Sequence, residues 1–408
     1  MPTLSRRALL LGAGSLAGCA TVAGRRGRTG FETTPALVPI RAQTDRIFDI
    51  AVCLRPFRAA GPRLDVERVG DACVVHNYGH GGSGWSLSWG SSAVAVRKAM
   101  AASPREIAVI GCGILGLTSA ILAQRAGAKV TIYARELLPE TPSARATGAW
   151  TPASRIALAE AAPPDFATLW EGMARTAFKT HRAYLGLPGD PVEWTDFYSV
   201  ADDEPRNSGT APKPGLDFAE YGDRIADLVP KPRRLSPEAA PFRAAAVYRS
   251  ENMIFNISDY GHTLLNDFFV AGGEFKHADF HLPSQIAALG KGAVIDCTGY
   301  GARALWKDET ITPVRGQIAR LIPQPAVRYG LSYRQVFVVP RRDGIVVQAV
   351  EGGDMKGFGD ADEAIDRAEA ERAVATLAEL FSPARWRGAT PLAATAEAAF
   401  PLSSSAAI

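Results

Sequence analysis

The strongest fold signal in the sequence is the stretch of residues 107–116, which read Ile-Ala-Val-Ile-Gly-Cys-Gly-Ile-Leu-Gly. Its four apolar residues predict a buried strand, and Gly111, Gly113 and Gly116 follow with the spacing G-x-G-x-x-G. Gly111 permits a tight turn, Gly113 lets a pyrophosphate approach the backbone, and Gly116 lets a helix pack closely on the strand. Free amides at the start of that helix would face the phosphates. The stretch therefore predicts a dinucleotide-binding turn.

The sequence after the turn completes a strand–turn–helix–strand unit. A helix is expected to run to about Ala126, and Val130–Tyr133 is expected to form the second strand. Arg135 and Glu136 follow roughly 20 residues after the glycines, where a carboxylate would bind the ribose hydroxyls. Because Glu136 stands one place later than the simplest spacing, Arg135 is expected to share this role. The glycine spacing alone does not distinguish NAD from FAD.

The rest of the chain predicts an α/β protein with a second sheet. Residues in Gln317–Leu321, Val336–Val339 and Ile345–Ala349 alternate as antiparallel strands do, and Glu204–Pro241 is expected to be surface loop. Further strands are expected at Ile47–Leu54, Arg63–Val66, Ala72–Val75, Val192–Val200, Glu274–His277 and Val294–Gly299, and helices at Ser91–Ala102, Pro163–Leu185, Asp259–Ala271 and Asp360–Leu380.

A second motif specifies the cofactor. Residues 74–84 read Val-Val-His-Asn-Tyr-Gly-His-Gly-Gly-Ser-Gly, and Trp89-Gly90 closes the segment. This segment resembles the signature of the D-amino-acid oxidase family at nearly every defined position. The resemblance implies FAD as cofactor, with the N–H groups of the glycine-rich backbone against the pyrimidine edge of the flavin. The alternative is a glycine-rich loop with a purely structural role.

Other segments resemble the same family. They are Ile132–Glu136 followed by Gly148–Pro152, Cys297–Gly299, Pro313–Gln317 and Leu54–Arg58. In the last segment the resemblance assigns Arg55 to the substrate carboxylate, which a guanidinium holds with two parallel charge-assisted hydrogen bonds. The alternative for Arg55 is an ion pair at the surface. Tyr333 occupies the first of two tyrosine positions of the family, but Phe337 occupies the second, so one phenol that would contact the carboxylate is missing.

The implied reaction is FAD-dependent oxidative deamination of D-amino acids, at a CH–NH2 group, to 2-oxo acids and ammonia. Arg55 and Tyr333 would orient the substrate so that hydride moves from Cα to flavin N5 without a side-chain base. Oxygen or a quinone would then accept the electrons. Two alternatives remain open: a periplasmic flavin dehydrogenase of another amine or hydroxy acid, and a flavin-binding protein without turnover. A nicotinamide dehydrogenase would leave residues 74–84 unexplained.

The cofactor-binding residues expected from the turn and from the resemblance form one set. They are Gly81, Gly82, Ser83, Gly84, Trp85, Ser86, Gly111, Gly113, Ile114, Leu115, Gly116, Arg135, Glu136, Ser143, Thr147, Gly148 and Thr298.

The order of the motifs differs from the family, in which the Arg-Pro and His-x-Tyr-Gly motifs lie at the C-terminal end. Here both precede the glycine turn, so we interpret the chain as circularly permuted, with Ser103–Arg105 bridging the old ends. The expected organisation is a signal at 1–19, a tether at 20–45, a permuted segment at 46–102, a Rossmann-type FAD-binding unit at 103–160, a substrate-domain part at 161–260, a return to the FAD domain at 261–316, and a mixed or antiparallel substrate-domain sheet with a helix at 317–400.

The N-terminus is expected to direct export. Residues 5–10 resemble a twin-arginine signal, and residues 16–19 resemble a lipobox that would make Cys19 the lipidated first residue of a periplasmic, membrane-anchored protein. The alternative is a frayed N-terminus with accidental arginines. The apolar run at 8–18 is far shorter than the roughly 20 residues that span a bilayer.

Charge and cysteine content exclude other classes. The net charge is +3, and removing Arg6 and Arg7 with the signal leaves 3 − 2 = +1, too little for a nucleic-acid footprint. No cysteine has metal-ligand spacing, and no metal site is expected. The four cysteines after Cys19 are expected to be free thiols, with a Cys53–Cys73 disulfide as the alternative. The expected partner is a small amine that carries a carboxylate.

Overall fold

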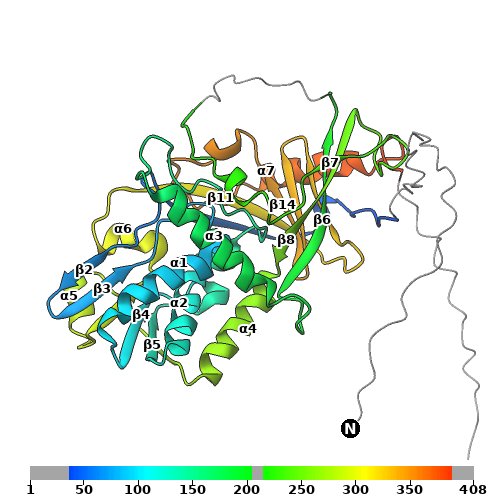
Figure 1. Ribbon diagram of the computed structural model, residues 1–408. Helices are drawn as coiled ribbons and strands as arrows, with labels where there is room; N and C mark the ends of the chain where they lie inside the picture. The colour runs from blue at the N-terminus through cyan, green and yellow to red at the C-terminus, as the bar shows by residue number, and fades with distance from the viewer. Residues whose placement is uncertain (1–35, 205–214, 388–408) are drawn as a thin grey trace, which may run out of the picture. The chain divides into compact units, whose positions relative to one another are not determined.

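The computed structural model describes residues 36–204 and 215–387. These residues form two sheets, one of six strands and one of eight (Figure 1). The expected α/β class, with a Rossmann-type unit and a mixed, mostly antiparallel sheet, is confirmed.

The six-stranded sheet is parallel except for one edge hairpin. Its strands are short and mostly buried because helices cover both faces, as parallel sheets require. In spatial order the strands are β2 (Val66–Val69), β3 (Ala72–His76), β10 (Ala293–Asp296), β4 (Glu106–Ile110), β5 (Lys129–Ala134) and β9 (Glu274–His277).

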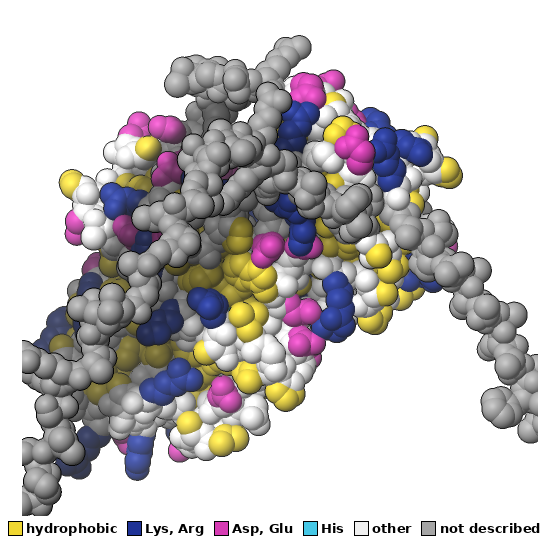
Figure 2. Space-filling model, turned by 45° about the vertical axis from the view of Figure 1, so that its right-hand side comes forward, with side chains coloured by type: hydrophobic (Ala, Val, Ile, Leu, Met, Phe, Trp, Pro, Cys, Tyr) yellow, Lys and Arg dark blue, Asp and Glu magenta, His cyan; other side chains and the backbone are white. Residues whose placement is uncertain are grey.

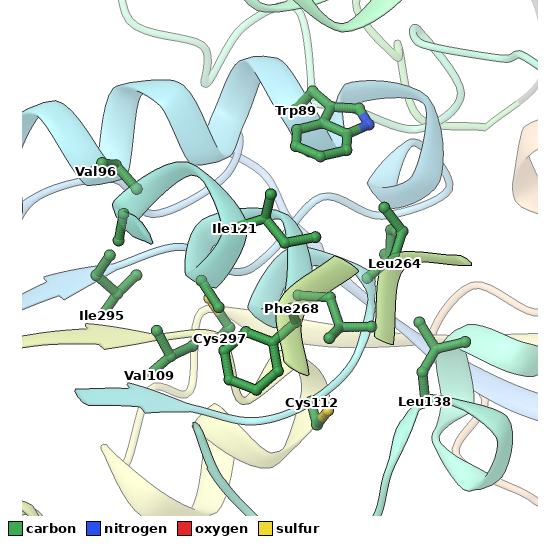
Figure 3. Packing of buried hydrophobic residues seen from close by; sticks show 14 of the residues in the cluster. Trp89, Val96, Val109, Cys112, Ile121, Leu138, Leu264, Phe268, Ile295 and Cys297 are labelled. Atoms are coloured by element: carbon green, nitrogen blue, oxygen red, sulfur yellow. The ribbon is translucent and has the colours of Figure 1, made fainter. Parts of the chain in front are cut away.

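One face of this sheet packs against three helices: α1 (Gly84–Ala99), α2 (Ile114–Arg125) and α4 (Ile257–Val270). Figure 3 shows Ile121 and Phe268 between these helices and the strand residues Val109 and Ile295. The helix α3 (Phe166–Arg182) packs on α1. The short helices α5 (Pro283–Ala287) and α6 (Ala302–Leu305) contribute apolar residues to the cluster on the opposite face.

The eight-stranded sheet pairs its neighbours antiparallel except for β12 and β6. The helix α7 (Arg367–Leu380) packs on one face, and the other face carries Phe337, Ile254 and Ile318 in a cluster with Ala149. In spatial order the strands are β1 (Ile47–Arg58), β11 (Ile311–Leu321), β14 (Gly344–Ala349), β13 (Val336–Arg341), β12 (Tyr329–Tyr333), β6 (Val192–Ala201), β8 (Ala246–Phe255) and β7 (Arg233–Arg234).

Short 3-10 turns connect these elements. They lie at Thr44–Arg46, Met100–Ala102, Leu138–Glu140, Pro142–Arg145, Gly222–Ile225, Gly299–Gly301 and Gly353–Met355. On the face that Figure 2 shows, hydrophobic side chains gather in the middle, and basic and acidic side chains are interspersed around them.

Several elements differ from expectation. The strand expected at Arg63–Val66 is instead β2 at Val66–Val69, and the described part of the segment expected as surface loop at Glu204–Pro241 contains the strand β7 and the buried residues Phe218 and Ile225. The helix α1 begins at Gly84 rather than at Ser91, because its first turns bury serines and glycine instead of an apolar stripe. The helix α7 begins at Arg367 rather than at residue 360, where the side chain of Asp366 caps it by accepting from the Glu369 amide. The expected tether ends before residue 45, because Ile40 and Ala42 are buried in the cluster beneath α7.

The cysteines of the described residues are free, as expected. Cys53 lies in the eight-stranded sheet and Cys73 in the six-stranded sheet, so the alternative disulfide is not formed. Cys19 lies outside the described residues. Within residues 36–204 and 215–387, the side chains form no cluster that could hold a metal ion. No helix in those ranges has the length and apolar character needed to cross a membrane.

Candidate functional site

The expected nucleotide-binding residues follow the carboxyl ends of neighbouring parallel strands. The glycine turn follows β4, Arg135 and Glu136 follow β5, and Thr298 follows β10. Parallel strands end at the same edge of a sheet, which is where ligands bind in open α/β folds. The structure therefore brings these segments together at one edge.

The glycine turn has no room for side chains. Gly111 has a φ of +97°, in the region that favours glycine, and a Cβ on it would lie 2.6 Å from the Cys297 carbonyl oxygen. A Cβ on Gly116 would overlap the Gly111 carbonyl oxygen. The first turn of α2 thus packs directly on the end of β4, with the free amides of its N-terminus at the sheet edge.

Ser143 connects this turn to the second motif. Its Oγ accepts a hydrogen bond from the Ile114 amide at 3.1 Å, and its carbonyl accepts one from Trp85 Nε1 at 2.8 Å. Ser143 also lies against Gly113, where a Cβ would be 2.8 Å from the serine hydroxyl. Residues from three distant parts of the sequence therefore meet at the N-termini of α2 and α1.

A buried carboxylate fixes Thr298. Asp296 is fully buried, and its Oδ1 accepts from the Thr298 hydroxyl at 2.7 Å and from the Thr298 amide at 3.1 Å. Its Oδ2 lies 3.0 Å from Nδ1 of the buried His76. His76 of the His-x-Tyr-Gly motif therefore supports the loop after β10 through Asp296, a residue for which the sequence indicated no role.

The Gly81–Ser86 segment, whose last three residues begin α1, lies against the loop that follows Trp150. The Gly82 amide and the Ser83 hydroxyl donate to the Ser154 carbonyl at 3.1 and 2.9 Å. The Thr151 amide donates to Ser86 Oγ at 2.8 Å. The two segments expected to contact the flavin therefore form one wall, which ends at the N-terminus of α1.

Thr147 and Gly148 connect this wall to the eight-stranded sheet. The Thr147 hydroxyl donates to Gln348 Oε1 on β14 at 2.7 Å, and Arg341 donates to the Ala146 carbonyl at 2.6 Å. Gly148 accepts from the Phe255 amide at the end of β8. Gln348 was not predicted, because a glutamine within an apolar strand gives no signal by itself.

Arg55 lies on β1 opposite Val314 of β11 and is half-buried. Its guanidinium lies over Gly316, where any side chain would collide with it. Among the described residues the guanidinium of Arg55 has no hydrogen-bond or ion-pair partner, so the alternative of a surface ion pair does not hold there. The next residue, Pro56, accepts a hydrogen bond from the Gly81 amide at 2.7 Å, which places Arg55 beside the glycine-rich wall.

Tyr333 does not lie beside Arg55, and its expected role as a substrate contact needs correction. It is buried in the cluster under α7, and its hydroxyl donates to Asp202 at 3.4 Å. The hairpin turn after it has Arg334 and Gln335 at φ +41° and +62°, so the strands reverse at once. Tyr333 pairs with Val336, so Phe337, the next residue, points to the opposite face of the sheet. There its ring stacks on the ring of Phe197, with 5.7 Å between the ring centroids.

The two residues expected at the ribose differ in exposure. Arg135 is 65% exposed in its side chain and lies 4.0 Å from Asp279, whereas Glu136 is partly buried. Arg155 was not predicted at all. It follows the Trp-Thr-Pro segment, and its position beside Arg55 depends on the folded loop rather than on sequence spacing.

The described residues fit a flavin dinucleotide. A Cβ on Gly299 would meet no atom within 4 Å, and one on Gly84 would meet only the His80 Cβ at 4.0 Å. Open space thus remains at the sheet edge and at the start of α1, while the glycines at 111 and 116 are tightly packed. The open space at the sheet edge suits a pyrophosphate, and the open space at the start of α1 suits a flavin ring. The tight packing at Gly111 and Gly116 is what a dinucleotide turn needs.

Comparisons with known proteins give one family match and several similar proteins. The DAO family model, described as FAD dependent oxidoreductase, matches residues 106–402, which is more than half of the chain. A D-amino-acid oxidase of Rubrobacter xylanophilus is 27% identical over 245 residues, covering 59% of this chain and 67% of that protein. A D-amino-acid oxidase of Dictyostelium discoideum is 27% identical over 217 residues, covering 52% of this chain and 56% of that protein. The crystal structure of iminodiacetate oxidase from Chelativorans sp. BNC1 aligns with a TM-score of 0.44 at 16% identity, covering 67% of this chain and 79% of that one.

Proposed function

Because the chain belongs to the DAO family of FAD dependent oxidoreductases, we propose that it oxidises D-amino acids to 2-oxo acids and ammonia. FAD is its cofactor, and when bound it accepts the hydride from the substrate Cα. The amine becomes an imine as its lone pair replaces the lost Cα–H bond, and water then hydrolyses the imine. The residues of the chain position the substrate, bind its carboxylate with a positive charge, and exclude water from the site.

The observation that carries this proposal is the guanidinium of Arg55, which has no partner among residues 36–204 and 215–387. Leaving a half-buried cation without a carboxylate is costly unless a ligand supplies the anion. Arg55 lies beside the wall made by the Gly81–Ser86 segment, because the next residue on β1, Pro56, accepts from the Gly81 amide. A substrate carboxylate held there by two parallel bonds would fix the Cα against this wall.

Phe337 stands where the family pattern has its second tyrosine, and it lies on the face of the eight-stranded sheet that carries Ala51 and Ile318. Its ring stacks on Phe197 and provides no hydroxyl for the carboxylate. Arg55 would then supply the directional bonds to the acid alone, and the two rings would exclude water around it. We expect weaker substrate binding than a site with a phenol at this position would give, by about 1 kcal/mol for one lost hydrogen bond.

The test replaces Arg55 by methionine, which keeps the length of the side chain and removes its charge. The Arg55→Met enzyme should retain FAD but lose at least about 100-fold in kcat/KM for D-amino acids, mostly through KM, because two charge-assisted bonds are lost. The matched control is Arg68→Met on the exposed edge strand β2, which should leave both constants within about twofold of wild type. Equal kcat/KM for Arg55→Met and wild type would contradict the proposal.

A second candidate function is a flavin dehydrogenase of another amine or hydroxy acid that passes electrons to a quinone. The observation that favours it is the missing phenol at Phe337, which leaves the identity of the substrate less constrained. Oxygen uptake during turnover would indicate an oxidase, whereas turnover only with a quinone or an artificial dye would indicate the dehydrogenase. FAD binding without reduction by any of these substrates would instead indicate a non-catalytic flavoprotein.

We also propose that the protein is exported through the twin-arginine route and anchored by a lipid on Cys19. The support is the sequence of residues 5–19, which lie outside the described part of the chain. A folded flavoprotein suits this route, because FAD would be bound before export. Membrane fractionation of the wild type and of Cys19→Ala tests the anchor, which the variant should lose.

We further propose that the chain is a circular permutation of the family order. The family model begins at residue 106, the first residue of β4, although β3 pairs with β10 in the same sheet. Ser103, at φ +48°, and the two residues after it lead directly from the end of α1 and its 3-10 turn into β4. Ile40 packs in one cluster with Leu377 of α7, so both ends of the described chain lie close together.

A further inference from the structure

Arg155 is a second half-buried cation, and it lies at the wall formed by the Gly81–Ser86 segment. It has a φ of +48°, and its side chain is 11% exposed. Its Nε donates to the Asp354 carbonyl at 2.7 Å and its Nη2 to the Gly353 carbonyl at 3.0 Å. Its Nη1 makes only a long contact of 3.4 Å with Ser154 Oγ. Three of its five N–H groups are thus used, and both strong acceptors are neutral carbonyls.

Backbone packing holds Arg155 and Arg55 near each other. Gly81 donates its amide to Pro56, the neighbour of Arg55, and a Cβ on Gly81 would overlap the carbonyl oxygen of Arg155. Burial, together with the positive charge of Arg55, lowers the pKa of Arg155 to about 10. The two guanidinium groups are therefore near enough for their like charges to oppose each other beside this wall.

The negative charge around this pair is small. The Asp354 carboxylate lies 3.7 Å from Arg155 Nε and is 52% exposed, so solvent screens it. Arg55 has no carboxylate partner among the described residues. Two cations beside one screened anion leave an excess of positive charge that a ligand with two negative groups would balance.

We propose that Arg155 binds a second anionic group of the substrate, so that the site prefers D-amino acids whose side chain ends in a carboxylate. This inference rests on the proposed function, in which Arg55 binds the α-carboxylate. Arg155 is then a specificity-determining residue. A neutral substrate would leave the free N–H groups of Arg155 buried and unpaired, whereas an acidic one would satisfy them.

The first experiment measures binding without turnover, from the change in the flavin absorbance of the holoenzyme. Succinate and butyrate each have four carbons and lack an amine, but only succinate is a dicarboxylate. Wild type should bind succinate at least about 10-fold more tightly than butyrate, and Arg155→Gln should bring the two dissociation constants together. Equal binding of the two acids by wild type would overturn the inference.

The matched control is Asp354→Asn, which removes a nearby negative charge and leaves both backbone carbonyls in place. It should keep or increase the preference for succinate. Loss of that preference in Asp354→Asn would contradict the inference, because the preference would then depend on the conformation of the loop rather than on Arg155.

The second experiment compares kcat/KM for D-glutamate and D-glutamine, which are nearly isosteric. Wild type should prefer D-glutamate, and in Arg155→Gln the ratio should fall by at least about 10-fold. A ratio that Arg155→Gln leaves unchanged would show that the arginine only holds its loop. Turnover of neutral D-amino acids with no acidic preference would refute this inference alone, whereas flavin that no D-amino acid reduces would refute the proposed function.

Discussion

Gly116 provides a direct test of how the dinucleotide turn is built. The change Gly116→Ala adds one methyl group in the first turn of α2, where it would overlap the Gly111 carbonyl oxygen. That carbonyl belongs to a turn residue at φ +97° and cannot move away without breaking the turn. Overpacking of this kind lowers the free energy of unfolding by about 3 kcal/mol, and the higher helix propensity of alanine raises it by about 1 kcal/mol. We expect a net loss of about 2 kcal/mol in stability.

The matched control is Gly172→Ala, which makes the same change within α3. No atom lies within 4 Å of a Cβ at Gly172, so only the helix propensity changes and stability should rise by up to about 1 kcal/mol. The assay is thermal unfolding of each purified protein with saturating FAD, followed by measurement of its FAD content. Gly116→Ala should melt below wild type and lose FAD, whereas Gly172→Ala should do neither. Full FAD content and an unchanged melting temperature in Gly116→Ala would refute this account of the turn.

Two further predictions concern buried polar groups. Burial lowers the pKa of His80 and of His181 to about 3, below the ordinary 6.5, so both are neutral when folded but gain protons when unfolded. The free energy of unfolding should therefore fall as the pH decreases from about 6.5 toward 3, by up to about 1.4 kcal/mol per pH unit for each histidine. Urea titrations at several pH values should show a smaller slope for His181→Gln than for wild type. Asp296→Asn should cost about 3 kcal/mol and weaken FAD binding, because it disrupts the buried bonds to Thr298 and His76; a melting temperature and FAD affinity equal to wild type would contradict this.

The nucleotide-binding unit could be predicted because its signals are local. The apolar run before Gly111 and the periodic residues after it specify the strand and helix within a short window, and the structure has β4 and α2 there. The start of α1 could not be read in this way. Its first turn buries Ser86, whose Oγ accepts a hydrogen bond from the Thr151 amide, a partner distant in the sequence that meets it only in the folded chain.

The positions of several residues at the proposed substrate site could not be predicted from the sequence pattern. The role of Arg55 rests on resemblance and stays a prediction. The position of Tyr333 could not be foreseen, because the turn after it has two residues at positive φ without a glycine to indicate a tight hairpin. Arg155 and Gln348 are isolated polar residues whose neighbours come from other segments. Their positions follow from the packing of the loop after Trp150 on the eight-stranded sheet.

The most direct test of the proposed function is the visible spectrum of the purified holoprotein, recorded without oxygen before and after adding single D- and L-amino acids. We expect the oxidised flavin band to bleach with D-isomers and to persist with the matching L-isomers. Because Arg55 holds the acid and the wall fixes the Cα, only one stereoisomer can direct its Cα–H correctly. A flavin band that neither isomer of any amino acid bleaches would contradict the central claim.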